Sequence, residues 1–243
     1  LGRFERIPVT IHRDHEAVAL AVANRIATLI ETRAREGRTA VLGLATGSTP
    51  LGVYRELVRR HREEGLGFEN VVTFNLVEYF PMPPERVQSY HRFMRKHFFD
   101  HVDVPPAQVH IPSGDVPREH AAAHCAGYEE AIRAAGGIDF QILGIGRSGH
   151  IGFNEPGSAR SSRTRLLYLD PVTRADAASD FFGEDSVPLE AITMGVATIL
   201  EARAIGLAAW GESKAEAVER ALTGPVGPDV PASFLRTHPG PVR

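Results

Sequence analysis

Four short apolar runs limit the folds open to this chain more than any other feature of its sequence. They span residues 39–45, 71–75, 138–145 and 204–210. A run that is apolar throughout, rather than at alternate positions, is typical of a strand buried on both faces of a parallel sheet. Three of the runs are followed by segments that favour helix. This alternation predicts an α/β fold, Rossmann-like, with an open, mostly parallel sheet and helices on both faces.

Capping residues indicate where the helices begin and end. Asp14 suits the N-cap of a helix that reaches residue 36, and Pro50 suits the first turn of a helix that Gly65 ends. Further helices are expected over residues 83–101, 117–135, 187–200 and 214–224. The remaining expectations are an edge strand over residues 7–11, a strand over 163–170, an irregular mobile lid over 170–186, and an extended tail over 224–243.

The composition favours a single domain over residues 1–243. A chain of 243 residues can form a full apolar core. Its net charge of −3 implies no broad basic surface, so neither nucleic acid nor a membrane is an expected partner. The single cysteine, Cys125, fits a reducing compartment. No apolar run reaches the roughly 18 residues of a membrane span, and no signal-peptide pattern is evident. These features predict a cytoplasmic protein.

A glycine-rich stretch follows the third apolar run, over residues 143–157. Its glycines let backbone amides turn toward a ligand, and His150 and Glu155 add a titratable pair. The glycines alone would fit a tight turn without any function equally well. The histidine and the glutamate favour a loop that belongs to an active site.

A second candidate site consists of Thr46, Gly47, Ser48 and Thr49, between an apolar run and a helix start. Free amide groups and the positive end of the helix dipole suit a phosphate at such a junction. The hydroxyl groups add further donors. The alternative is that a Ser or Thr side chain only caps the helix, although capping alone does not need the whole run.

These groups are far apart in sequence but are expected to converge. Parallel strands have their carboxyl ends at one edge of the sheet, where ligands bind in open α/β folds. The groups are the turn at 46–49, Glu78, His150, Glu155 and Lys214. Two histidine pairs with helical spacing, at 97/101 and 120/124, lack a clear further ligand, so no metal site is expected.

Several motifs, in the same order along nearly the whole chain, resemble those of the glucosamine-6-phosphate deaminases, also called glucosamine-6-phosphate isomerases. They are Thr46-Gly47-Ser48-Thr49-Pro50, Val72-Thr73-Phe74-Asn75 with Glu78-Tyr79, residues 98–103, residues 149–156, Ser162-Arg163-Thr164-Arg165 and Ser213-Lys214-Ala215. The resemblance implies conversion of glucosamine 6-phosphate and water to fructose 6-phosphate and ammonia, without a metal or organic cofactor. It also implies that the turn and Lys214 bind the phosphate, and that His150, partnered by Glu155, opens the sugar ring.

Three positions depart from the family's pattern. Val77 stands where the family has the aspartate that acts as enolisation base, and Ser148 where it has an aspartate two residues before the histidine. Asp180 replaces a phosphate-binding arginine, for which Arg174 is a candidate substitute. Glu78 is a poor geometric replacement for residue 77, because neighbouring side chains on an extended segment point to opposite faces. We therefore expect weak or absent turnover.

The resemblance leaves three functions open. The first is a glucosamine-6-phosphate deaminase/isomerase-like enzyme that acts on an amino-sugar phosphate with altered acid-base residues. The second is a catalytically impaired phosphosugar-binding or regulatory domain, and the third is a 6-phosphogluconolactonase-like hydrolase. A homo-oligomer and a fused C-terminal domain are both compatible with the sequence. Leu167 replaces a lysine of the family's activator site, which argues against allosteric control.

Overall fold

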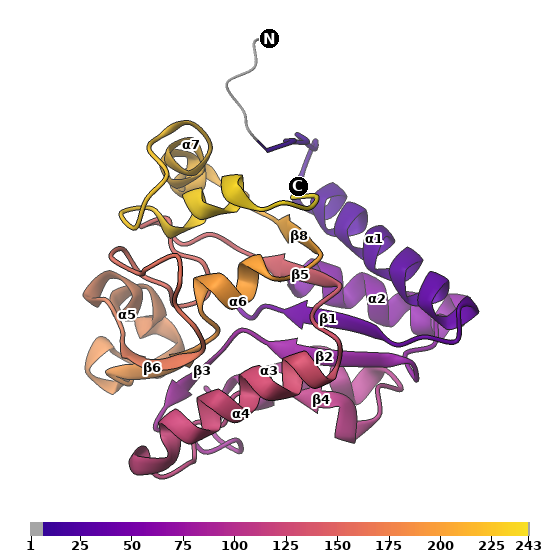
Figure 1. Ribbon diagram of the computed structural model, residues 1–243, viewed down its shortest axis with the longest axis horizontal. Coiled ribbons are helices and arrows are strands. Elements are labelled where there is room, and N and C mark those ends of the chain that lie inside the picture. Colours follow the sequence, from indigo (N-terminus) through magenta and orange to yellow (C-terminus); the bar gives the residue numbers. More distant parts are fainter. Residues whose placement is uncertain (1–6, 243) are drawn as a thin grey trace.

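A parallel sheet lies at the centre of the computed structural model, which describes residues 7–242 (Figure 1). Within these residues the sheet has five strands in the order β4-β2-β1-β5-β8, and every neighbouring pair is parallel. The strands are β1 Ala40–Leu44, β2 Val71–Asn75, β4 Val109–His110, β5 Phe140–Leu143 and β8 Ala204–Leu207. The predicted fold class and all four apolar strands are confirmed.

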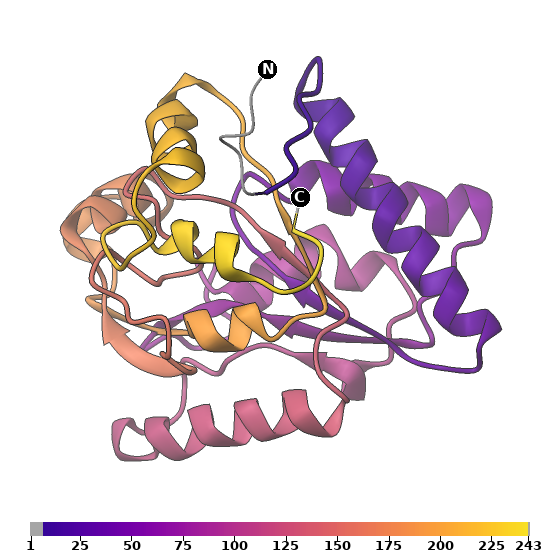
Figure 2. The same cartoon turned by 45° about the horizontal axis from the view of Figure 1, so that its top comes forward.

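Helices cover both faces of this sheet, as predicted (Figure 2). One face packs on α1 His15–Arg35, α2 Leu51–Glu64 and α3 Tyr90–His97, in an apolar cluster that includes Leu42. The other face, which includes Val41, packs on α4 Ala121–Ala134, α6 Val196–Leu200 and α7 Ala215–Thr223. Neighbouring strand residues thus serve opposite layers, which explains why the strands are apolar throughout.

A second, antiparallel sheet extends from the carboxyl end of β2 and was not predicted as a sheet, although the strand expected over residues 163–170 is confirmed within it. Its order is β3-β7-β6, formed by β3 Val77–Phe80, β7 Glu190–Thr193 and β6 Arg165–Tyr168. Leu76 joins the two sheets, because its amide donates to the carbonyl of Leu44 and its carbonyl accepts from the amide of Met194. The second sheet therefore begins at the edge where ligands were expected.

The predicted caps of the first two helices are confirmed in position. Asp14 accepts a hydrogen bond from the amide of Ala17 at 2.7 Å, at the start of α1. Gly65 ends α2 in the left-handed region, at φ 75°, which glycine adopts without strain.

The helix expected over residues 83–101 is shorter than predicted. It begins at Tyr90, after the N-cap Ser89, and Val87, which precedes it, is 71% exposed. The first amides of α3 donate to the buried carboxylate of Glu78, which fixes the start of the helix.

The helix expected over residues 187–200 is wrong for its first part. Residues 190–193 form β7, and Gly195, the N-cap of α6, separates this strand from the helix. β7 lies between β3 and β6, so its backbone pairs on both sides. Pairing with strands that are distant in sequence overrides local helix preference here.

Three other segments differ from expectation. Residues 7–11 form no strand. The segment 170–186 is not irregular, because it contains α5 Pro171–Ala177 and two 3₁₀ turns, Ala178–Phe181 and Glu184–Ser186. The tail contains a 3₁₀ segment, Pro231–Thr237, rather than being extended throughout. Short helices like α5 have too few turns to produce a periodic apolar pattern, which is why the sequence did not reveal it.

Across residues 7–242, we find no helix with both the length and the apolar character that crossing a membrane requires.

Candidate active site

The loop after β5 brings His150 and Glu155 together, as predicted. Nδ1 of His150 lies 3.0 Å from Oε2 of Glu155, and the two side chains are 17% and 11% exposed. Ser148 Oγ lies 2.9 Å from the same ring nitrogen and 3.5 Å from Oε2 of Glu155. The sequence-predicted pair and the divergent Ser148 therefore form one polar cluster.

Two glycines give this loop its shape. Gly149 has φ 84°, a conformation that favours glycine. A Cβ on Gly146 would lie 2.1 Å from Cε1 and Nε2 of His150, so the ring fits only because this residue has no side chain. The amide of Gly146 donates to the carbonyl of His150 at 3.0 Å and closes the loop.

The contacts of His150 determine which ring nitrogen is available for chemistry. A carboxylate only accepts hydrogen bonds, and the Ser148 hydroxyl can accept as well as donate, so the contact with Glu155 favours the neutral ring with its proton on Nδ1. None of the described residues forms a hydrogen bond to Nε2. An imidazole held in this way can accept a proton at Nε2 from a ligand and return it.

Glu155 has a second buried partner that sequence reasoning missed. The hydroxyl of Thr173, on α5, donates to Oε1 of Glu155 at 2.5 Å, and Thr173 is 7% exposed. No sequence signal indicated this contact, because it depends on how α5 packs against the loop.

The turn of Thr46, Gly47, Ser48 and Thr49 lies beside the start of the glycine-rich stretch. A Cβ on Gly144 would lie 3.3 Å from Oγ1 of Thr49, so the turn and the stretch are in close contact. Pro50 is the N-cap of α2 and makes no side-chain cap hydrogen bond. The alternative that a Ser or Thr hydroxyl of this turn caps α2 is therefore wrong, and Thr46 lies beside the hydroxyl of Tyr90.

Lys214 lies near the other side of the glycine-rich loop, just before α7. Burial lowers the pKa of its amine. The charge of Asp176 raises this pKa and the charge of Arg147 lowers it, so both residues lie near Lys214. Arg147 belongs to the loop and forms an ion pair with Asp176 of α5, with Nε 3.1 Å from Oδ2. The structure thus brings Lys214, the loop and α5 into one neighbourhood, and the ion pair was not predicted.

The carboxylate of Glu78 is fully engaged by hydrogen bonds away from the glycine-rich loop. Its fully buried carboxylate accepts hydrogen bonds from Ser89 Oγ at 2.8 Å and from the amides of Tyr79, Tyr90 and His91 at 2.9–3.1 Å. Burial raises the pKa of Glu78 to about 7. The contacts from Ser89, Tyr90 and His91 tie β3 to the start of α3, so Glu78 supports the fold.

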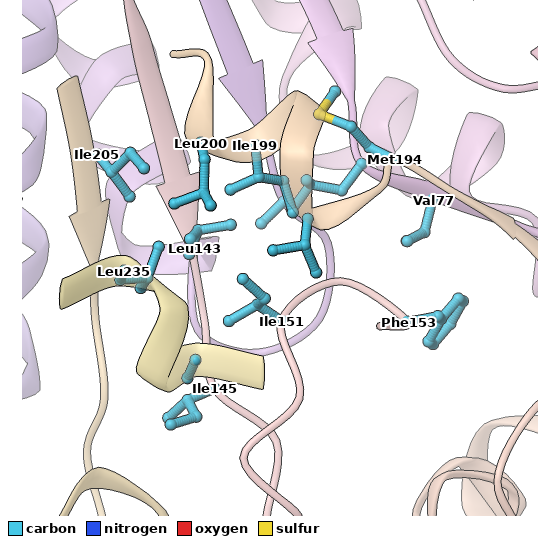
Figure 3. Close-up of a cluster of buried hydrophobic side chains, with 14 of the residues drawn as sticks. Val77, Leu143, Ile145, Ile151, Phe153, Met194, Ile199, Leu200, Ile205 and Leu235 are labelled. Carbon is cyan, nitrogen blue, oxygen red and sulfur yellow. The ribbon is translucent and has the colours of Figure 1, made fainter. Parts of the chain in front are cut away.

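Val77 packs in the apolar cluster next to the loop (Figure 3). It is 5% exposed, and a Cβ on Gly152 would lie 3.6 Å from its Cγ1. In Figure 3 its side chain is on the same side of the cluster as Phe153. Residue 77 is therefore next to the loop that carries His150, as the resemblance implied, but its side chain cannot transfer a proton.

Asp180 lies near the hydroxyls of Tyr79 and Tyr90, and the hydroxyl of Tyr90 is beside Thr46. Burial is the main cause of the raised pKa of both hydroxyls, and the negative charge of Asp180 adds to it. The neighbouring Phe181 packs edge-on against Tyr79, with ring centroids 4.8 Å apart. A carboxylate at this place opposes the binding of an anion.

Arg174 is engaged elsewhere. Its Nη2 donates to the carbonyls of Glu184 at 2.9 Å and Val187 at 3.5 Å, and so ties together the ends of its own segment. These contacts do not support the suggestion that Arg174 replaces a phosphate-binding arginine.

No group of three or more His, Cys, Asp or Glu side chains that could hold a metal ion occurs in the part of the chain that the structure describes.

Known proteins match this chain over almost all of its length. A family model described as glucosamine-6-phosphate isomerases/6-phosphogluconolactonase matches residues 13–242. Glucosamine-6-phosphate deaminase 2 of Giardia intestinalis is 51% identical over 223 residues, which cover 91% of this chain and 82% of that protein. A solved structure of a monomeric glucosamine-6-phosphate deaminase is 42% identical, with a TM-score of 0.92 over 97% of this chain and 95% of that one.

One relative is much longer than this chain. A putative glucosamine-6-phosphate deaminase-like protein of Bacteroides thetaiotaomicron is 42% identical over 238 residues, and the match covers 98% of this chain but only 36% of that protein. Because the family model matches nearly every residue and the Giardia protein shares half of the aligned positions, the chain belongs to the glucosamine-6-phosphate isomerase/6-phosphogluconolactonase family.

Proposed function

We propose that the chain binds an amino-sugar phosphate and is a glucosamine-6-phosphate deaminase-like protein with altered acid-base residues and strongly reduced turnover. One observation carries this proposal. The His150–Glu155 pair, with a 3.0 Å contact, lies on the same glycine-rich stretch that contacts the turn at 46–49. The names of the similar proteins support the choice of substrate.

The retained groups fit the opening of a sugar ring. Nε2 of His150 takes the proton of the anomeric hydroxyl and returns a proton to the ring oxygen, so that the cyclic sugar becomes the open aldehyde. Glu155 holds the imidazole ring of His150 through Nδ1. It also stabilises the positive charge of the imidazole while both ring nitrogens carry a proton.

The next step of the family reaction moves the proton at C2 to C1, which leaves an imine at C2. Water then hydrolyses this imine to give fructose 6-phosphate and ammonia. That step requires a base beside C2. The resemblance assigns this role to residue 77, which is an apolar Val77 here, and Glu78 is occupied by four hydrogen bonds. Loss of one general base typically costs about 10² to 10⁴-fold in rate.

Phosphate binding rests on the free amides of the turn at 46–49 and on Lys214. The hydroxyl groups of Ser48 and Thr49 do not cap α2, so both remain available as donors to the phosphate. A charge-assisted hydrogen bond contributes about 1.5–3 kcal/mol. The charge of Asp180 works against this binding, and we expect a modest affinity.

A second candidate function is a sugar-phosphate-binding or regulatory domain without turnover. The burial of Val77 in the apolar cluster favours this second function. The groups proposed to bind the sugar phosphate are retained, but no base is present at residue 77 to take the proton from C2. The larger Bacteroides relative makes a role within a longer protein a reasonable form of this proposal. The lactonase alternative has in its favour the name of the family and a fold shared with solved 6-phosphogluconolactonase structures, which are 24% identical or less.

Ligand-induced stabilisation tests the proposal. We expect glucosamine 6-phosphate to raise the melting temperature, and free glucosamine to have a smaller effect at equal concentration. Lys214→Ala should remove the stabilisation, whereas Lys96→Ala, which changes the only other lysine of the sequence, should not. Equal shifts in both variants, or no shift in the unaltered chain, would contradict the proposal.

A further inference from the structure

The hydroxyl of Thr173, in the first turn of α5, makes its hydrogen bond outside its own helix. It donates to Oε1 of Glu155 at 2.5 Å, eighteen positions earlier in the sequence. The contact is buried, so water does not compete for either partner.

The two oxygens of Glu155 therefore have different partners. Oε1 accepts from Thr173, and Oε2 lies 3.0 Å from Nδ1 of His150. The terminal torsion of a glutamate has a broad range of orientations unless its oxygens are held. With Oε1 fixed by Thr173, Oε2 stays directed at the ring.

We propose that Thr173 is a positioning residue, which through Glu155 keeps His150 in the tautomer that has its proton on Nδ1 and an accepting Nε2. This inference rests on the proposed function for its consequence, since an accepting Nε2 is what ring opening needs. The contact itself does not depend on the identity of the sugar.

The position of Thr173 on α5 makes this state depend on the packing of that helix. α5 is also tied to the glycine-rich loop by the ion pair between Asp176 and Arg147. The 3₁₀ turn that follows it packs Phe181 against Tyr79. The orientation of Glu155, and through it that of the His150 ring, therefore depends on how α5 packs against the loop.

The test is the tautomer of His150, measured by nitrogen-15 NMR of the imidazole rings in the intact chain at a pH where the ring is neutral. His150→Gln identifies the signals. In the unaltered protein we expect the Nδ1–H form to dominate. Thr173→Val, which keeps the shape and removes the hydroxyl, should shift the ratio toward Nε2–H by about threefold or more, and Thr173→Ser should restore it.

A matched control removes a hydroxyl that bonds elsewhere. Thr223 donates to the carbonyl of Glu219 at 2.8 Å on α7, so Thr223→Val should leave the His150 tautomer unchanged. Thr173→Ala provides a second removal of the hydroxyl if the valine variant does not fold. An unchanged tautomer ratio in either variant would overturn the proposal. Unfolding of both would assign Thr173 to the fold alone and would likewise reject it.

This readout needs no ligand, so it separates the two proposals. A tautomer shift without any binding of glucosamine 6-phosphate would refute the proposed function and leave the role of Thr173 standing. Binding of glucosamine 6-phosphate without a tautomer shift would refute the role of Thr173 and leave the proposed function standing.

Discussion

The hydroxyl of Ser89 donates a hydrogen bond to Oε2 of Glu78 at 2.8 Å inside the protein. With Glu78 turned toward the start of α3, the alternation of side chains along β3 sends Val77 to the other face, next to Gly152. The acidic residue of this pair thus supports a helix, and the apolar residue lies beside the loop that carries His150.

The first prediction concerns the pH dependence that Glu78 contributes. Burial raises its pKa to about 7 from 4.5, so folding favours the neutral carboxyl. A group with a raised folded pKa contributes stability that is fully present below pH 4.5 and is lost as the pH rises through about 7. We expect a loss on the order of 3 kcal/mol across this window.

Urea unfolding at several pH values measures this effect. The stability of the unaltered chain relative to Glu78→Gln should fall between pH 4.5 and pH 7, because glutamine does not titrate. A difference that stays constant with pH would show that the carboxyl does not change its charge in this window.

The second prediction concerns Asp180 and the affinity for sugar phosphate. Removing an exposed charge near a bound anion is worth up to about 1 kcal/mol, so Asp180→Asn should tighten the binding of glucosamine 6-phosphate about two- to fivefold. Calorimetry at low and high salt measures it, and salt should reduce the gain. Asp185→Asn, in the following 3₁₀ turn, is the control and should change little. Equal affinity gains from both variants would mean that Asp180 has no special position.

The third prediction concerns Gly146. Alanine here would place a Cβ 2.1 Å from the His150 ring, so the ring or the loop must shift. We expect Gly146→Ala to cost about 1–3 kcal/mol of stability and to displace the imidazole in a crystal structure. Gly67→Ala is a suitable control, since nothing lies within 4 Å of its added carbon. An undisturbed imidazole in the Gly146 variant would contradict the described loop geometry.

The fourth prediction restores the groups that the resemblance implies. The combined variant Val77→Asp, Ser148→Asp, Asp180→Arg should release ammonia from glucosamine 6-phosphate faster than the unaltered chain. The same variant with Val77→Asn in place of Val77→Asp has a side chain of equal size that cannot act as base, and it should not gain. A similar gain in both would show that residue 77 is not the missing base.

The sequence predicted the central sheet because its strands are buried on both faces and are therefore apolar throughout. It predicted α1 and α2 because Asp14 and Gly65 leave local signals at the helix ends. It did not predict the small sheet, because β7 is stabilised by pairing with β3 and β6, which are distant in sequence. The late start of α3 was missed for a related reason, since it depends on the Glu78 carboxylate.

The candidate site was predicted where its parts are close in sequence. His150 and Glu155 share one loop, so spacing placed them near each other, and the resemblance implied their contact. Thr173 and the Arg147–Asp176 pair could not be predicted, because they depend on how a short helix without a periodic pattern packs on that loop. The engagement of Arg174 by backbone carbonyls of its own segment has the same origin.

Ammonia release from glucosamine 6-phosphate by the unaltered chain is the most direct measurement of whether a base is missing beside the reacting carbon. We predict release that is weak or absent under conditions where the same preparation is stabilised by the sugar phosphate. Turnover at roughly 1 to 10³ per second, the usual range for enzymes, would contradict the claim that the base is missing. Val77 cannot take a proton, so another group would then have to act as the base.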